Sequence, residues 1–156
     1  MRKEAQAWGF DLIVGFMIFT VAIVTFYFFA LNFSGQDEEI SQELVFEGKL
    51  IGESLLSEGS PKNWDPSDVV IIGILDSEGK INETKLQNFL LLDYDTTKEL
   101  FNIRHDYYIN FSKELNVSGG VSGVGNMDDG SENLAVVRRV SSYNGEPITL
   151  SIYLSD

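Results

Sequence analysis

A long apolar segment near the N-terminus constrains this chain more than any other feature. Residues 12–36 contain no charged side chain, and residues 12–31, LIVGFMIFTVAIVTFYFFAL, are almost wholly apolar. Some twenty helical residues, at about 1.5 Å each, cover about 30 Å, the thickness of a bilayer's hydrocarbon layer. A core helix of a soluble protein would carry a polar stripe at the helical period, which this segment lacks. We therefore expect a transmembrane helix over about residues 12–33.

A removed secretory signal is the alternative, because the segment follows Arg2 and Lys3. Its apolar region is longer than the roughly 7 to 15 residues of such signals, and the sequence after it, NFSGQDEE, has no clear small-x-small cleavage site. Basic residues precede the helix and acidic residues follow it. The positive-inside tendency then predicts a cytoplasmic N-terminus and a C-terminal part outside the cell.

Composition limits what the exported part can do. The formal net charge is −13, and almost all of it follows the apolar segment, so nucleic acid is an unfavourable partner. The chain has no cysteine and a single histidine, His105. A zinc site or a histidine-activated nucleophile therefore has too few residues to be built from, and His105 is expected to be an ordinary surface or strand-end residue. We predict no catalytic residue, no metal and no cofactor.

The helical pattern continues beyond the apolar segment. Apolar residues recur at spacings of four, seven and four, at Ile40, Leu44, Ile51 and Leu55. Gly59-Ser60-Pro61 then supplies a signal that ends the helix. This predicts one long helix over residues 6–59, transmembrane in its first half and amphipathic in its second. Gly35, Gly48 and Gly52 are expected to be its weak points. Residues 60–156 are left to form an extracellular α+β head.

Local signals divide the first part of the head. The β-branched run VVIIGIL at 69–75 predicts a central strand covered on both faces. Asn82 is expected to cap a short helix over ETKLQNFLLL, with Ile81 and Leu86 at the spacing of a hydrophobic staple. Asp95 is expected to cap a second short helix, TTKELFNI.

The rest of the head reads as strands. Alternation of apolar and polar residues predicts strands over 105–111, 133–142 and 146–155, with a hairpin at Asn144-Gly145. A strict two-residue turn would place the charged Arg139 opposite the apolar Leu150. A longer turn, or a position of this strand at the edge of the sheet, is therefore an alternative. The predicted fold class is α+β, with a long N-terminal helix packed on a small antiparallel sheet with short helices.

Two loops contain residue types that could bind ions. The segment SGGVSGVG at 118–125 lacks the ending of a phosphate-binding loop and is expected to be a flexible loop. The next segment, NMDDGSEN, offers oxygen ligands of the kind that calcium takes, at a spacing that fits no EF-hand: Asn126, Asp128, Asp129 and Glu132. An acidic hairpin tip without calcium is the preferred interpretation.

Four Asn-x-Ser/Thr sequons occur, at Asn32, Asn82, Asn110 and Asn116. We expect Asn110 and Asn116, on the exported head, to be glycosylated in preference to the other two. Asn82 is needed as a helix cap, and Asn32 lies close to the membrane.

The short motif EAQA at 4–7, directly before the apolar helix, resembles the class III signal peptide of archaeal type IV pilin-like proteins. The resemblance implies that a prepilin peptidase cuts on the cytoplasmic side, after Ala5, so that residues 1–5 are a leader and Gln6 becomes the N-terminus. The position that is acidic in many bacterial pilins is Phe10 here, with Asp11 one place later. Asp11 is then the residue expected to contact a neighbouring subunit through that subunit's N-terminal amine, and the alternative is that Asp11 simply lies at the membrane interface.

The resemblance also implies a function and a location. The chain is expected to be a structural subunit of a type IV pilus-like surface filament, and not an enzyme. Its partners would be the membrane, copies of itself packed through their N-terminal helices, or other pilin-like subunits. The alternative is a single-pass, membrane-anchored extracellular binding domain that does not polymerise.

Overall fold

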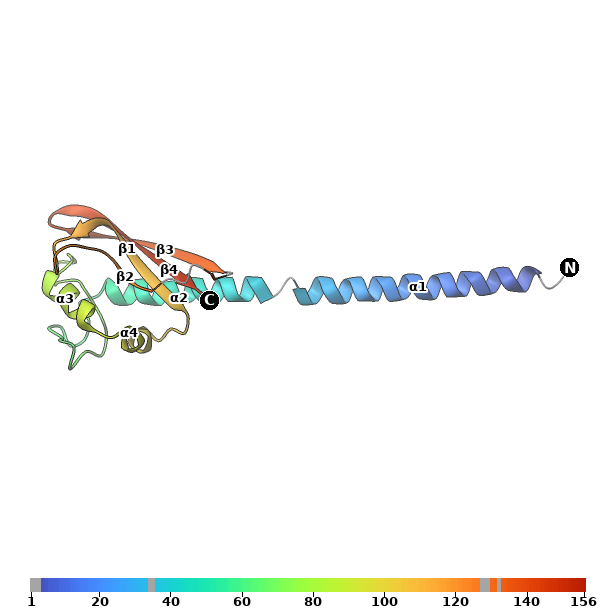
Figure 1. Ribbon diagram of the computed structural model, residues 1–156, viewed down its shortest axis with the longest axis horizontal. Coiled ribbons are helices and arrows are strands. Elements are labelled where there is room, and N and C mark those ends of the chain that lie inside the picture. The colour runs from blue at the N-terminus through green and yellow to red at the C-terminus, as the bar shows by residue number, and fades with distance from the viewer. Residues whose placement is uncertain (1–3, 34–35, 127–129, 132) are drawn as a thin grey trace. The chain divides into compact units, whose positions relative to one another are not determined.

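The computed structural model describes residues 4–33, 36–126, 130–131 and 133–156. The chain divides into two compact units, Met1–Glu39 and Ile40–Asp156, and the second unit is called the head below. The elements follow in the order α1, α2, α3, α4, β1, β2, β3, β4 (Figure 1). The predicted α+β class is confirmed: a long apolar N-terminal helix is followed by short helices that pack on a four-stranded antiparallel sheet.

Two helices occupy the range predicted for one long helix. Helix α1 covers Glu4–Phe33 and α2 covers Gln36–Leu55. The predicted weak point Gly35 lies outside the described residues. α2 ends before the predicted stop at Gly59, because the chain turns at Ser57: its N–H bonds the Ser54 carbonyl at 3.1 Å, and its hydroxyl accepts from the Gly59 N–H at 3.0 Å.

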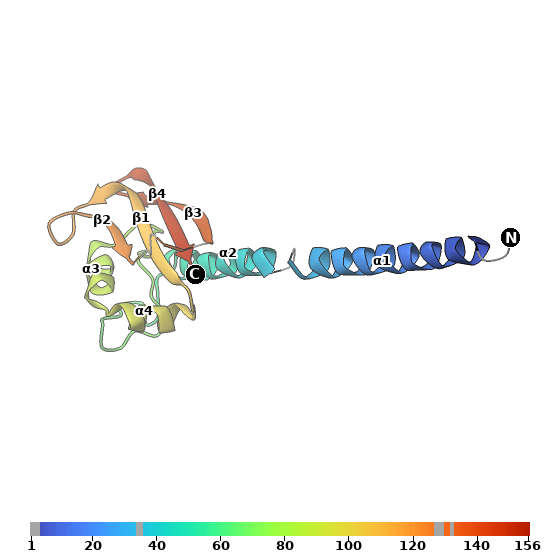
Figure 2. The same ribbon diagram turned by 45° about the vertical axis from the view of Figure 1, so that its right-hand side comes forward.

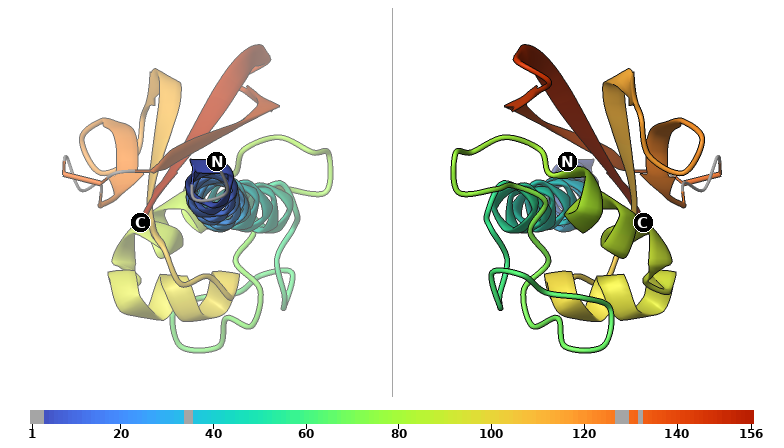
Figure 3. Two further views of the ribbon diagram at one scale, coloured as in Figure 1. Left: turned by 90° about the vertical axis from the view of Figure 1, so that its right-hand side faces the viewer. Right: turned by 90° about the vertical axis from the view of Figure 1, so that its left-hand side faces the viewer.

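The sheet has the order β2-β1-β4-β3 and is antiparallel throughout (Figure 2). Its strands are β1 (Asp106–Leu115), β2 (Val121–Gly125), β3 (Leu134–Tyr143) and β4 (Glu146–Ser155). Alternate residues are buried, as predicted, including Tyr107, Ile109 and Phe111 on β1 and Ile148, Leu150, Ile152 and Leu154 on β4. The helices of the head all lie against the face formed by these buried residues, and the other face is open (Figure 3).

The β3–β4 hairpin has the two-residue turn that Asn144-Gly145 predicts, since Tyr143 pairs with Glu146 and both turn residues have positive φ angles. Arg139 therefore does lie opposite Leu150. The pairing is tolerated because β3 is an edge strand, where the Arg139 side chain stays half exposed and passes over Gly52 of α2.

Helix α2 packs closely on the sheet, through two of the residues predicted to be weak points. A Cβ atom on Gly48 would lie 2.7 Å from side-chain atoms of Leu154 and Val137. A Cβ on Gly52 would lie 3.1 Å from the Arg139 side chain. The helix continues through both glycines, so it does not melt at these predicted weak points. The absence of a side chain at each lets the helix approach the strands.

The two short helices begin at polar caps. Helix α3 (Glu83–Leu91) begins after Asn82, whose side chain accepts a hydrogen bond from the Lys85 N–H at 3.1 Å, as predicted. Helix α4 (Tyr94–Phe101) is capped by Asp93, which accepts from the Asp95 N–H, so the prediction that Asp95 is the cap is wrong. Asp95 lies in the first turn instead, where its charge is favourable near the helix N-terminus.

The β-branched run 69–75 forms no strand, in contrast to the prediction. Its backbone forms isolated bridges and bonds to the end of α2, for example from the Ile74 N–H to the Leu55 carbonyl at 3.0 Å, and side chains bond several of its carbonyls. Ile72, Ile74 and Leu75 are buried, whereas Val70 and Ile71 are exposed. The run is apolar because its second half is buried in the core. It is not a strand because it does not pair with any strand of the sheet.

The glycine-rich segment was predicted to be a flexible loop, and its second half is strand β2 instead. β2 pairs with β1 through Val124 opposite Ile109 and Gly123 opposite Asn110. Gly123 has no room for a side chain, because the Tyr108 hydroxyl lies 2.0 Å from the position of a Cβ. The absence of a side chain at Gly123 therefore leaves space for the Tyr108 ring to lie over the edge strand β2.

Gly48→Val should lower the free energy of unfolding of the head by about 1–3 kcal/mol, because the added side chain overlaps Leu154 and Val137. Denaturant titration of the detergent-solubilised chain, followed by the fluorescence of the buried Trp64, measures this change. Lys49→Val is the matched control, since it puts the same β-branched residue at the next, exposed position and should change stability by no more than about 0.5 kcal/mol. Equal losses in both variants would show that the overlap with Leu154 and Val137 is not the cause.

Candidate functional site

Helix α1 is the only helix among the described residues that is long and apolar enough to cross a membrane. The span is Gly9–Leu31, 23 residues with a mean hydropathy of 2.5, and none of it is buried within the chain. Large apolar side chains are exposed all along it, including Phe10, Phe16, Phe26 and Leu31. Such a surface needs lipid or other apolar helices around it, because water does not solvate it.

The two threonine hydroxyls within this span are satisfied inside the helix. The hydroxyls of Thr20 and Thr25 donate to the carbonyls of Phe16 and Val21, four residues earlier, each at 2.8 Å. These bonds give both threonine hydroxyls an acceptor, which lowers the cost of placing them in hydrocarbon.

The residues of the predicted processing site all lie in α1. Ala5 and Gln6 belong to its first turns, and Asp11 lies near the N-terminal end of the Gly9–Leu31 span with its side chain exposed. None of the ion pairs in the described part of the chain includes Asp11. A carboxylate so close to an apolar span is expected to lie at the membrane–water interface or to bind a cationic partner.

The four predicted glycosylation residues have different surroundings. Asn116 is exposed in the turn after β1, whereas Asn110 is half buried within β1 and has partners on both sides, Gly123 and Ser151. Asn82 is occupied as the cap of α3, and Asn32 lies in the last turn of α1. Among these residues, Asn116 is the most accessible in the folded head.

Glu43, Glu47 and His105 meet between α2 and the start of β1, and sequence reasoning missed this cluster. Glu47 is only 4% exposed, and its two carboxylate oxygens accept from the backbone N–H groups of Arg104 at 3.0 Å and His105 at 3.2 Å. The His105 Nδ1 atom lies 3.0 Å from the same carboxylate. His105 is therefore not an ordinary strand-end residue: it joins β1 to α2.

A signal for this contact was present in the sequence. Glu47 lies three residues after Leu44 and four before Ile51, which places it on the buried stripe of α2. A carboxylate on an apolar stripe needs hydrogen-bond donors, and the chain supplies two amides and an imidazole. The ligand atoms of Glu43, Glu47 and His105 lie within 4.8 Å of one another, so the group could hold a cation, but the buried carboxylate already has a structural role.

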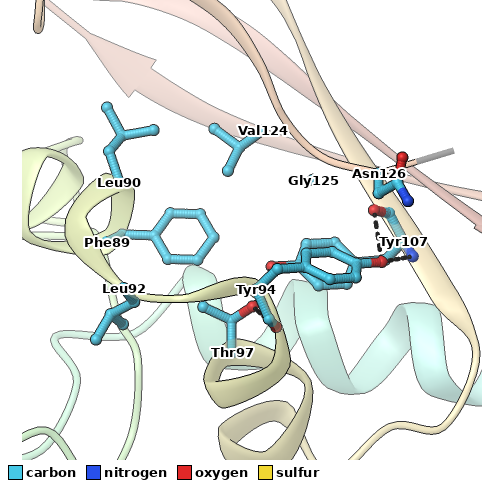
Figure 4. A pocket seen from close by; sticks show the side chains of 9 residues that line it. All are labelled: Phe89, Leu90, Leu92, Tyr94, Thr97, Tyr107, Val124, Gly125 and Asn126. Carbon is cyan, nitrogen blue, oxygen red and sulfur yellow. Dashed lines mark hydrogen bonds between the residues drawn. The ribbon is translucent and has the colours of Figure 1, made fainter.

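A second polar centre surrounds a cavity of about 400 Å³ between α3, α4 and the edge of β2 (Figure 4). The rings of Tyr94 and Tyr107 stack at 5.1 Å between centroids, and the Tyr107 hydroxyl bonds Thr97 at 2.6 Å. The Tyr94 hydroxyl accepts from the Tyr107 N–H at 2.9 Å and donates to the Asp106 carboxylate at 3.1 Å. Leu90, Leu92 and Val124 line the opposite, apolar side of the cavity.

The ionisation of this centre follows from its surroundings. Burial raises the pKa of the Tyr107 phenol to about 12, and burial also raises the pKa of Tyr94. The hydrogen bond from the Lys98 ammonium, at 2.9 Å, lowers the pKa of Asp106. At neutral pH both phenols are therefore neutral and lie beside a carboxylate–ammonium pair.

The loop predicted to be a calcium-free acidic tip lies largely outside the described residues, as do Asp128, Asp129 and Glu132. Asn126 is described: it is exposed, and its backbone N–H donates to the Tyr107 carbonyl at 2.8 Å.

Fold and site together define a class of protein, an α+β head that follows a helix able to span a membrane. No family model matches the chain, and no curated protein or solved structure gives a match.

Glu47→Gln should lower the free energy of unfolding by about 1–3 kcal/mol, because an amide NH₂ would replace one of two buried acceptor oxygens and leave the backbone N–H of Arg104 or His105 unpaired. Denaturant titration of the full chain measures the loss. Glu43→Gln, at a more exposed site, should cost no more than about 0.5 kcal/mol.

The same titration tests the expectation of no metal. Midpoints should agree in chelator and in added calcium or zinc. A zinc-dependent rise that Glu47→Gln and His105→Ala both abolish would contradict that expectation and establish an ion site.

Tyr107 should make the head sensitive to alkali. Its pKa in the folded head, about 12, lies above the ordinary value of 10.0, so its contribution to stability is complete below pH 10 and is lost as the pH rises through about 12. Denaturation midpoints of the wild type should fall between pH 10 and 12, and those of Tyr107→Phe should fall less steeply. Parallel pH profiles for the two proteins would refute this assignment.

Proposed function

We propose that this chain is a structural subunit, a pilin or pseudopilin, of an extracellular type IV pilus-like filament. The observation that carries the proposal is the position of the EAQA motif, directly before a 23-residue apolar span that the rest of the chain does not bury. A signal that is cut before its apolar segment keeps the anchor. An anchor that is exposed all round can later exchange lipid contacts for contacts with sister helices.

The chemistry of α1 supports such an exchange. Helices in lipid associate through close van der Waals packing and through the few polar groups that find partners. Asp11 supplies one such group, since a new N-terminal amine at Gln6 of an adjacent subunit would be a cationic partner. A row of large aromatic and aliphatic side chains, which includes Phe16, Phe19 and Phe26, supplies the packing surface.

The head supports the same proposal through its fold and charge. An α+β head that combines a helix, short helices and an antiparallel sheet is consistent with a pilin-like fold. The net charge of −13 lies almost entirely after α1 and keeps such heads soluble at a cell surface. In this proposal the N-terminus is cytoplasmic before cleavage by a prepilin peptidase, and the head is extracellular.

A second function has an observation in its favour. The cavity beside Tyr94 and Tyr107 has an apolar wall next to a few polar groups, features of a site for a small molecule. A membrane-anchored binding domain that does not polymerise would use this cavity alone. Recovery of the native protein in sheared surface filaments favours the subunit, whereas recovery only in membranes favours the anchored domain.

The processing site provides the sharpest test. The mature protein should begin at Gln6, having lost Arg2 and Lys3 but kept the whole apolar helix. N-terminal peptide sequencing of native protein measures this. Conventional secretory cleavage would start the chain near residues 31 to 36, and an uncut anchor would keep residues 1–5.

Ala5→Phe should leave the precursor uncut in the membrane and stop filament formation, because a bulky ring replaces the small residue before the scissile bond. Ala30→Phe, the same substitution near the other end of α1, should be processed normally. Assembled protein that still contains Lys3 would remove the main support for the proposal.

A further inference from the structure

One edge of the sheet has unpaired backbone groups over most of its length. β3 pairs with β4 on one side, and on its other side the loop before α3 covers only its C-terminal end, where the Ile81 N–H donates to the Ser142 carbonyl at 2.9 Å. Within the described residues, no backbone hydrogen bond reaches this free side between residues 134 and 140. Long free edges are usually blunted or paired.

The same stretch presents an apolar, basic surface. The residues on the open face of β3 are Leu134, Val136, Arg138 and Val140, and the three apolar side chains are 52%, 41% and 66% exposed. The strand contains two arginines and no acidic residue, in a chain of net charge −13. None of the ion pairs in the described part of the head includes Arg138.

A surface of complementary character lies in the loop after α2. Val70 is 66% and Ile71 is 46% exposed, and two acidic residues precede them, Asp65 and Asp68. The Ser67 hydroxyl donates to the Asp65 carboxylate at 2.6 Å and lowers its pKa, so this group is ionised at neutral pH. The Asp68 carboxylate accepts from the Asp65 N–H at 2.8 Å, which holds the loop in one conformation.

These two surfaces cannot meet within one head. The loop after α2, green in Figures 1 and 2, lies on the helix side of the head, and the open face of β3 lies on the opposite side. The views in Figure 3 agree with this placement. Two different complementary patches on opposite sides of one molecule form a heterologous pair, and such pairs join copies head to tail without closing a dimer.

We propose that the exposed stretch of β3, residues 134–140, binds the 65–71 loop of a second copy of this chain. The contact packs Val136 and Val140 against Val70 and Ile71 and brings Arg138 to the aspartates of the loop. The inference rests on the proposed function, since it identifies the contact between successive heads of a filament. Charge complementarity selects a second copy over another acidic partner, because this chain itself carries both halves of the pair.

Disulfide trapping tests the contact in the full chain, which has no native cysteine to interfere. Chains carrying both Val140→Cys and Val70→Cys, expressed in the native host and oxidised on intact cells, should give a ladder of covalent dimers, trimers and higher species. Mixed copies that each carry one of the two cysteines should stop at dimers. The pair Val140→Cys with Glu99→Cys, an exposed position on α4, is the matched control and should give at least about fivefold less product.

Charge reversal tests the electrostatic half of the contact. Arg138→Asp should lower the yield of the ladder by about five- to tenfold, and adding Asp68→Lys should restore most of it. Because Asp68 also bonds its own loop, salt provides a second measurement: about 1 M NaCl, which screens charges beyond about 3 Å, should lower the yield with the native charges.

The outcomes separate this inference from the proposed function. Filaments that contain the cysteine pair without any ladder would overturn the head contact and leave the subunit role standing. A ladder in membranes from which no filament can be sheared would support the contact and contradict the filament. Homodimers formed by Val140→Cys alone would show that β3 pairs with β3, and would overturn the heterologous contact.

Discussion

The packing of α2 against the inner face of the sheet is the contact on which the rest of the head depends. Gly48 and Gly52 bring the helix close to Val137, Leu154 and Arg139. Their neighbours on the same stripe, Leu44, Ile51 and Leu55, are fully buried. One face of a single helix thus closes the core that β1, β3 and β4 leave open. The cost of two glycines in a helix, about 1 kcal/mol each, is offset by the close contact that they allow.

Buried polar side chains then hold the irregular connections, in a head that has no disulfide. Glu47 accepts from two amides before β1, and the Lys85 ammonium donates to the carbonyls of Glu58 and Leu75, each at 2.7 Å. The Trp64 indole donates to the Gly73 carbonyl at 2.9 Å. Each bond satisfies a backbone group that no helix or strand pairs. The long loop between α2 and α3 is ordered in this way, which also gives its exposed residues a fixed conformation for binding.

The two units of the chain have different surfaces, and each suits a different contact in the proposed filament. The apolar surface of α1 suits lipid or sister helices, and no helix in the described part of the acidic head is long and apolar enough to cross a membrane. On the head, the exposed apolar residues of β3 and of the 65–71 loop carry opposite charges beside them. Assembly through such surfaces would add weak contacts between heads to a strong contact between helices, and many weak contacts repeated along a polymer are sufficient to fix its geometry.

The sequence by itself determined the features that depend on neighbouring residues. The length and apolarity of residues 12–31 specify a helix able to span a membrane, the Asn144-Gly145 pair specifies the hairpin turn, and Asn82 specifies the start of α3. In each case the deciding atoms lie within a few residues of one another. Propensity and pattern therefore suffice.

Only the tertiary structure decided the features that depend on a distant partner. The 69–75 run has the composition of a strand but forms only isolated bridges. The glycine-rich β2, in contrast, is a strand because it pairs with the edge of β1. Glu47 and His105 lie 58 positions apart in the chain, and neither residue alone predicts the other. The free face of β3 and the loop after α2 likewise become a matched pair only when folding places them on opposite sides of the head. Hydrogen bonding and burial require a partner in space, and the partner is set by how the whole chain packs.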